Sequence, residues 1–307
     1  MNENKSNFTN FSKLKFVITI TILVVVWAFA FLFIKIGLEE LSFVNLTIMR
    51  FLIACLVLIL ILFFQKKRIS KLHKKDIVPI FLLGFFGVIV YHLGLNYGEQ
   101  FISPAAASLI IATVPVEIII LSTIFLKEKI GLKKLIGVII ALCGVVVISI
   151  WGKAGASIHI EYISAVLAVL IAAIMSALYT IAGKKLLTRY SALSLTTYAM
   201  LLGSLGLTPF IRGSLLDQIL KMSMTGWFSV IFLGVFSTVV GYGLWYIVLK
   251  IKSASEISIY LYAIPVLSTI ISYFMFKEKI TLMFILGGFL VIAGLIIVNI
   301  RAKINFK

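Results

Sequence analysis

The sequence predicts an all-α membrane protein in which ten transmembrane helices form two inverted five-helix repeats. Of its 307 residues, 62% are hydrophobic and 13% are charged, whereas soluble domains average roughly 45–50% apolar and about 25% charged residues. Charged or Gly/Pro-bearing gaps divide the chain into ten apolar lengths. The second half also resembles the first when the sequence is shifted by 150 residues.

Each apolar length is close to what a membrane crossing requires, because about 20 helical residues span a bilayer core roughly 30 Å thick. The first length follows Lys13 and Lys15 and runs too far for a signal peptide, so we expect an uncleaved span. The predicted spans are 15–36, 43–64, 77–97, 102–126, 131–151, 161–182, 193–211, 225–249, 255–276 and 281–300.

The basic residues predict the orientation of these spans in the cell membrane. If the N-terminus is cytoplasmic, 21 of the 28 lysines and arginines fall on the cytoplasmic side and 5 on the other side. The excess of positive charge inside predicts that both termini are cytoplasmic. The net charge of +17 therefore serves topology and leaves no basic face for nucleic acid. This gives an N-terminal tail (1–14), a first repeat (15–151), an extracytoplasmic linker (152–160), a second repeat (161–300) and a cytoplasmic tail (301–307).

The repeat is clearest in two segments that contain charged residues and proline. "TVPVEIIILSTIFLKEKI" (113–130) and "AIPVLSTIISYFMFKEKI" (263–280) share 8 of 18 positions, and the same shift aligns Gly137 with Gly287 and Gly144 with Gly294. Five predicted spans separate the copies, so the second copy must cross the membrane in the opposite direction. Inverted repeats are typical of secondary transporters, whose substrate sites lie at the repeat interface near the bilayer midplane.

Several further stretches resemble the drug/metabolite transporter superfamily, in particular its EamA-type ten-helix members. They are "WAFAFLFIKIGLEE", "LGLNYGEQFISPAAASLIIATVPV", "FLKEKIGLKKLIGVIIALCGVVVI" and "FKEKITLMFILGGFLVIAGLIIV". The resemblance covers about residues 15–300. It implies alternating access around a central cavity lined mainly by helices one, three, four, six, eight and nine, with relatives that export amino acids, drugs or other metabolites. One departure is that Ala28 and Phe29 follow Trp27, where members commonly have glycine and serine.

Glu117 is the most distinctive residue of the predicted membrane interior. It lies ten residues from Lys127, or ~15 Å along a helix, which places it near the midplane. Leu267 occupies the equivalent position of the second half. Burial disfavours the charged form of a carboxylate, so Glu117 suits proton coupling or pairing with a cationic cargo group. The structural alternative is a hydrogen bond to another helix. Pro115 and Pro265 are the predicted helix hinges.

Arg50 and His92 are further candidates for substrate binding or coupling. Arg50 lies roughly 10 Å inside the second span and has three possible roles: neutralising Glu117, binding an anionic cargo group, or extending its charge to the membrane surface. His92 lies near the outer end of the third span and suits a pH-sensitive gate or an interhelical hydrogen bond.

Four aromatic residues lie in the middle parts of predicted spans, namely Trp27, Tyr179, Tyr242 and Tyr260. Their rings with a polar edge suit the walls of a cavity. Packing between helices, with the polar atom satisfied, is the alternative for each residue.

These observations predict a secondary active transporter that exports a small organic metabolite, with proton coupling through Glu117. The expected partners are that substrate, membrane lipids and protons; a monomer and a homodimer both remain open. The alternative within transport is an uncoupled facilitator or exchanger. A membrane-embedded enzyme or lipid-binding sensor is the alternative outside it, but the sequence has no motif for catalysis, metal binding or a cofactor.

Overall fold

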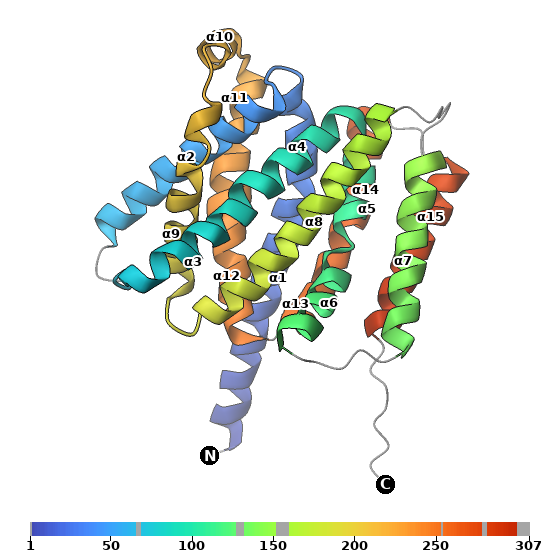
Figure 1. The fold of residues 1–307 in the computed structure, drawn as a ribbon. Coiled ribbons are helices and arrows are strands. Elements are labelled where there is room, and N and C mark those ends of the chain that lie inside the picture. Colours follow the sequence, from blue (N-terminus) through green and yellow to red (C-terminus); the bar gives the residue numbers. More distant parts are fainter. Residues whose placement is uncertain are drawn as a thin grey trace.

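The regular structure of the described residues is entirely helical, which confirms the predicted fold class. The computed structural model describes residues 2–65, 69–126, 132–151, 160–252, 254–277 and 281–299, and Figure 1 shows its helices packed as a bundle from which the start of α1 protrudes. The linker expected at 152–160 falls outside the described residues except for its last residue. The C-terminal tail and most of the two Lys-Glu-Lys segments also fall outside them.

Most helices of the second half have an equivalent in the first half, in the same order. The main helices of the first half are α1 (Asn2–Leu38), α2 (Phe43–Phe64), α3 (Ile77–Gly84), α4 (Tyr91–Phe101), α5 (Pro104–Ile111), α6 (Val114–Leu126) and α7 (Leu132–Trp151). Those of the second half are α8 (Ile160–Leu186), α9 (Ala192–Leu205), α10 (Ser214–Lys221), α11 (Met224–Ile231), α12 (Gly241–Ile251), α13 (Ala254–Ser258), α14 (Ala263–Phe276) and α15 (Leu282–Asn299).

Most helix boundaries agree with the predicted spans. Five helical stretches of the described residues are long and apolar enough to cross a bilayer: Leu14–Leu38, Phe43–Phe64, Lys74–Phe101, Glu161–Leu186 and Met224–Ile251. The count of ten spans stays a prediction. Residues assigned to an N-terminal tail are helical, because α1 begins at Asn2.

Helix α9 differs most from its predicted span, which was expected to reach residue 211. It ends at Leu205, with Gly206 as its C-cap. A short 3₁₀ helix, η4 (Thr208–Phe210), follows and has Pro209 in its first turn. Because proline lacks a backbone N–H, it cannot continue the α-helical bonding of the preceding turn.

Helix α2 shows why this bundle requires a lipid environment. Its outer face exposes large apolar side chains, among them Leu56, Leu60 and Phe63, whereas Arg50 and Leu58 on its inner face are buried. An exposed apolar surface of this kind is favourable in hydrocarbon and unfavourable in water.

Two π-helical segments interrupt corresponding spans of the two halves. The first, η3 (Phe85–Val90), separates α3 from α4, and the second, η5 (Phe232–Val240), separates α11 from α12. The shift of 150 residues carries 85–90 onto 235–240, within η5. π-Helical turns are uncommon and often occur at functional sites, and here each is followed directly by the first residues of α4 or α12.

Two further interruptions precede the prolines that the sequence predicted as hinges. Helix α5 ends at Ile111 and α6 begins at Val114, with two residues between them, and Pro115 is the second residue of α6. In the second half a 3₁₀ helix, η6 (Ile259–Tyr262), precedes α14. Pro115 and Pro265 have no N–H to donate, so the carbonyls of Ile111 and Leu261 lose their usual helical donors.

Helices α7 and α15 pack side by side as an antiparallel pair (Figure 1). A side chain at Gly144 would come within 2.6 Å of the carbonyl oxygen of Gly287, and one at Gly294 within 2.5 Å of the carbonyl oxygen of Gly137. These two contacts exchange when the halves are exchanged, as a two-fold relation requires. Since equivalent helices of the two halves run antiparallel, the repeats are inverted.

Hydrogen bonds join the two halves at two ends of the molecule, and they follow the same two-fold relation between the halves. The backbone N–H of His73 donates to the hydroxyl of Tyr190 at 3.1 Å, and Tyr190 donates to Asp76 at 2.9 Å. The backbone N–H of Ser223 donates to the carboxylate of Glu40 at 2.6 Å. His73 and Ser223 are repeat equivalents, as are Glu40 and Tyr190, so one contact is built twice from different side chains.

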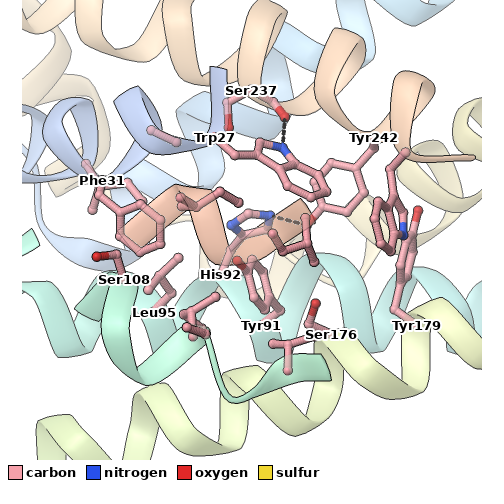
Figure 2. Close-up of a pocket in the computed structure, with 18 of the residues that line it drawn as sticks. Trp27, Phe31, Tyr91, His92, Leu95, Ser108, Ser176, Tyr179, Ser237 and Tyr242 are labelled. Atoms are coloured by element: carbon pink, nitrogen blue, oxygen red, sulfur yellow. Dashed lines mark hydrogen bonds between the residues drawn. The ribbon is translucent and has the colours of Figure 1, made fainter. Parts of the chain in front are cut away.

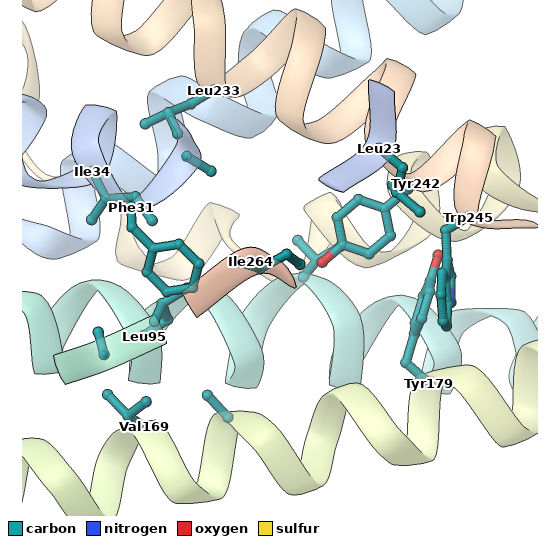
Figure 3. Packing of buried hydrophobic residues seen from close by; sticks show 14 of the residues in the cluster. Leu23, Phe31, Ile34, Leu95, Val169, Tyr179, Leu233, Tyr242, Trp245 and Ile264 are labelled. Atoms are coloured by element: carbon teal, nitrogen blue, oxygen red, sulfur yellow. The ribbon is translucent and has the colours of Figure 1, made fainter. Parts of the chain in front are cut away.

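The apolar core lies where helices of both halves converge. Figure 3 shows Phe31 of α1 and Leu95 of α4 on the side of Val169 of α8. Trp245 of α12 lies beside Tyr179 at the other side of the picture, with Ile264 of α14 between the two groups. Lipid provides no hydrophobic drive between helices, so close packing of such side chains must hold the bundle together.

We expect Gly294→Ala to destabilise the protein by about 1–3 kcal/mol, since the added carbon would overlap the α7 backbone. Gly288→Ala is the matched control in the same helix, because its added carbon would lie 3.7 Å from Leu109, at ordinary contact distance. Thermal unfolding in detergent, followed as loss of the monodisperse protein, measures the difference. Equal midpoints for the two variants would contradict this packing.

Candidate substrate site on the repeat axis

A pocket lies at the centre of the bundle, between the two halves. Four of its lining residues come from α1, three from α4 and three from α8. The lining residues are Trp27, Ala30, Phe31, Ile34, Arg50, Tyr91, His92, Leu95, Ser108, Ile111, Ala112, Val114, Ser176, Tyr179, Thr180, Ser237, Tyr242, Trp245, Leu261, Ile264 and Pro265. They belong to the six helices that the family resemblance implied, with Arg50 added from the second span.

Five pairs of repeat equivalents line this pocket together. In each pair the second residue follows the first by 150 positions: Ala30 and Thr180, His92 and Tyr242, Leu95 and Trp245, Ile111 and Leu261, and Val114 and Ile264. A cavity whose walls contain equivalent residues of both halves must surround the axis that relates them. One of these pairs is Ile111 and Leu261, the two residues whose backbone carbonyls lose their helical donors at Pro115 and Pro265.

His92 and Tyr242 mark the axis most directly, because they touch each other. Nε2 of His92 and the hydroxyl of Tyr242 are 3.1 Å apart and share a hydrogen bond, which Figure 2 shows at the centre of the pocket. A residue can contact its own repeat equivalent only close to the two-fold axis. Both residues follow a π-helical segment, so the irregular backbone and the contact occur at the same place.

Arg50 brings a buried cation to the pocket. It is 2% exposed, and it donates from Nε to the hydroxyl of Thr238 at 2.7 Å and from Nη2 to the hydroxyl of Ser237 at 2.8 Å. Its third nitrogen, Nη1, has no hydrogen-bond partner among the described residues. The carboxylate of Glu99, which is fully buried, lies close enough to interact electrostatically with this guanidinium.

Aromatic side chains form one wall of the pocket. The indole Nε1 of Trp27 donates to the carbonyl of Ser237 at 3.1 Å, and its ring centroid lies 5.7 Å from that of Tyr242 and 5.8 Å from that of Trp245. Tyr179 meets Tyr242 edge-on with ring centroids 5.4 Å apart. These contacts are visible in Figure 2 for Trp27, Tyr179 and Tyr242. Such rings supply apolar surface with a few polar edges.

Gly241 makes room for this wall, since a side chain there would overlap the indole nitrogen of Trp27. Tyr91, the repeat equivalent of Gly241, lines the pocket itself. The two halves therefore use the same position differently: one leaves space for a ring of α1, and the other contributes a ring of its own.

Glu117 lies near the pocket but is not among its lining residues. Val114, one turn earlier in α6, does line it. The hydroxyl of Thr113 lies 3.0 Å from Oε1 of Glu117 and 2.7 Å from the carbonyl oxygen of Ile110. Oε2 of Glu117 has no hydrogen-bond partner among the described residues.

The other predicted site residues fall into two groups. Trp27, Arg50, His92, Tyr179, Tyr242 and Pro265 all line the pocket. Tyr260 lies outside it, 45% exposed, with its ring 5.7 Å from that of Phe16. Pro115 also lies outside the pocket, whereas its neighbour Val114 lines it.

Sequence reasoning missed the residues that hold Arg50. Ser237 and Thr238 stand in an apolar run, where two adjacent hydroxyls are a weak but readable signal. Glu99 was missed because it lies near the end of its span, where a carboxylate ordinarily reaches water. Lys35 donates to the backbone carbonyl of Glu99 at 2.8 Å, so this region contains two cations and one anion.

We expect Ser176→Cys to react with a water-soluble thiol reagent faster than Ala177→Cys. Both residues lie on α8 at nearly the same depth, but Ser176 lines the pocket and Ala177 is buried in packing. The two native cysteines, Cys55 and Cys143, are first replaced by serine, and labelling is followed by mass spectrometry. Equal labelling rates would show that the pocket is not open to water.

The chain matches a known family twice, once in each half. The model of the EamA-like transporter family matches residues 14–150 and again 163–300. A solved crystal structure has the same fold, with a TM-score of 0.65 at 18% identity, covering 93% of this chain and 96% of the other.

Individual relatives agree with this match. An uncharacterized transporter of Archaeoglobus fulgidus is 39% identical, covering 86% of this chain and 91% of its own length. The uncharacterized transporter YdfC of Bacillus subtilis is 33% identical, covering 85% and 83%. A probable terminal-alkyne amino-acid exporter of Streptantibioticus cattleyicolor is 29% identical, covering 87% and 88%. The chain therefore belongs to the EamA-like transporters of the drug/metabolite transporter superfamily, and its function is transport.

Proposed function

We propose that the protein exports a small organic metabolite by alternating access, with the pocket on the repeat axis as its single substrate site. The observation that carries this proposal is the contact of His92 with its repeat equivalent Tyr242 inside the pocket. Substrate sites of inverted-repeat transporters lie at the repeat interface near the membrane midplane. A site on the axis stays in place when the two halves exchange their conformations.

The local backbone supports a site of this kind. The helices before Pro115 and Pro265 are interrupted, and the two residues whose carbonyls lose helical donors line the pocket. Irregular backbone at membrane depth is tolerated where it is enclosed by protein or lines a cavity. We infer that these breaks are the hinges at which the halves of each span move.

Export of an organic metabolite is supported by the lining and by one relative. The walls are mainly apolar and aromatic with a few polar groups, as in sites for small organic molecules. The Streptantibioticus relative is named a probable exporter of an amino acid. We propose both termini on the cytoplasmic side, from the 21 to 5 distribution of basic residues.

We further propose that Glu117 couples transport to protons. The single hydroxyl proton of Thr113 serves either the carbonyl of Ile110 or the carboxylate of Glu117, although both oxygens lie within hydrogen-bond distance. A proton on Glu117 would complete both bonds, with Glu117 donating to Thr113 and Thr113 donating to Ile110. Thr113 and Glu117 thus form both hydrogen bonds when Glu117 is protonated, and only one of the two when it is ionised.

An uncoupled facilitator or exchanger is the second candidate, and one observation favours it. Glu117 does not line the pocket, so a cargo can occupy the pocket without touching the carboxylate. In that case Glu117 only ties α6 to its own preceding turn through Thr113.

Metabolite profiling tests the direction of transport. Cells that lack the protein should accumulate the exported metabolite, and cells that overproduce it should release more of it to the medium. Depletion inside the deletion strain would instead indicate uptake and would contradict export.

We expect Glu117→Gln to abolish flux driven by a pH gradient in proteoliposomes while leaving exchange at equal pH on both sides. The amide cannot take up and release a proton, but it keeps the shape and an acceptor for Thr113. Leu267→Gln places the same amide at the equivalent position of the second half and should leave coupling unchanged. A Glu117→Gln protein with the wild-type pH dependence would favour the uncoupled exchanger.

A further inference from the structure

We infer that Arg50 and His92 form an anion subsite in the pocket, which takes the carboxylate of a cargo with an apolar body. The inference rests on the proposed transport site and adds the chemical class of its cargo. Two polar atoms carry it: Nη1 of Arg50 and Nδ1 of His92 are both buried, and neither has a hydrogen-bond partner among the described residues. Both residues line the pocket.

The guanidinium of Arg50 is held in place with one nitrogen left to bind. Thr238 and Ser237 accept from Nε and Nη2, which fixes the plane of the group and leaves the two hydrogens of Nη1. Arginine stays charged in proteins, and a buried charge with an unmet donor is costly. A carboxylate on Nη1 would remove that cost through a charge-assisted hydrogen bond.

The imidazole of His92 is also held rigidly. Its ring packs against Tyr91 at 4.6 Å and Phe51 at 4.9 Å between centroids, and Nε2 shares a hydrogen bond with the hydroxyl of Tyr242. When Tyr242 donates in this bond, Nδ1 carries the proton of the neutral imidazole and becomes a second unmet donor. Tyr242 is then a positioning residue, which sets the tautomer of His92.

The two donors belong to one site. Arg50 is close enough to His92 and to Tyr242 for electrostatic interaction with both. A carboxylate has two oxygens, so it can accept from two separate donors at once. Figure 2 shows His92 at the centre of the pocket, with the apolar side chains of Phe31 and Leu95 on one side.

The charge balance favours an anion over a cation. None of the lining residues is acidic, and Arg50 is the one lining residue that is always charged. Behind it, Lys35 contacts the backbone of Glu99, so Arg50, Lys35 and Glu99 sum to one net positive charge when the nearby Glu117 is protonated. A carboxylate neutralises that charge, whereas an amine without a carboxylate would add to it.

The remaining surface defines the body of the cargo. Phe31, Leu95, Trp245 and Ile264 offer apolar and aromatic contact, and nothing among the lining side chains requires a second charge. We therefore assign the subsite to organic monocarboxylates, with or without an amino group, whose body is apolar.

Binding of matched probes to the purified full-length protein tests this assignment. 3-Phenylpropanoate, its neutral amide 3-phenylpropanamide, and 2-phenylethylamine share one apolar body and differ in charge. Quenching of the pocket tryptophans, Trp27 and Trp245, reports binding. Measurements are made at raised ionic strength, because the net charge of +17 attracts any anion to the surface.

We expect the wild-type protein to bind the carboxylate at least about tenfold more tightly than the amide, because one hydrogen bond to a charged group has an effect of this size. The amine should bind most weakly. Arg50→Met, which introduces the residue found at the equivalent Met200, should abolish this preference while the amide still binds. Lys250→Met removes an exposed charge of α12 that does not line the pocket, and it should change the preference by less than about threefold.

Tyr242→Phe keeps the test informative if Arg50→Met does not fold. It should reduce carboxylate affinity by several-fold with less change for the amide, because only the carboxylate has a second accepting oxygen for His92 once the first is bound to Arg50. A merely structural role of Tyr242 would weaken both probes equally. Equal binding of carboxylate and amide, or no carboxylate binding at millimolar concentration, overturns the inference. Neither result affects the proposed export, which the metabolite profile tests independently.

Discussion

The contact between His92 and Tyr242 is the constraint on which the rest of this structure depends. These residues are repeat equivalents and meet at 3.1 Å, so the axis between the two inverted halves passes through the pocket. The antiparallel pairing of α7 with α15 and the equivalent π-helical segments follow the same relation. A cavity on this axis is lined by both halves, as a single alternately exposed site at the repeat interface requires.

Chemistry enters where the two halves stop being equivalent. Arg50 faces the pocket in the first half, and the equivalent residue of the second half is the buried Met200. Glu117 likewise has Leu267 as its equivalent. Equivalent residues of the two halves build part of the walls and both predicted hinges, whereas Arg50 and Glu117, which have apolar equivalents, supply the charge. A scaffold of this kind can change its cargo by substituting a few unpaired positions without disturbing the relation between the halves.

The sequence predicts the helices better than it predicts the site. Apolar length and charged gaps give the bounds of α2 correctly, because lipid dictates both. The sequence also names His92 and Tyr242 as separate candidates. Their contact depends on how distant helices cross, which no local sequence pattern predicts. The π-helical turns add a residue to the helical turn and so rotate the side chains that follow. Glu117 follows a different irregularity, the break between α5 and α6, so depth along one ideal helix could not show that it would miss the pocket lining.

Distances between spin labels at the two ends of the molecule test alternating access around this axis most directly. Lys75 and Thr188 are exposed at one end, and Glu39 and Thr225 are exposed at the other. Pulsed dipolar spectroscopy in lipid nanodiscs, with and without a transported metabolite, measures each pair separately. We expect one distance to lengthen as the other shortens. Two distances that stay fixed, or that change in the same direction, would contradict a single site exposed by two inverted halves.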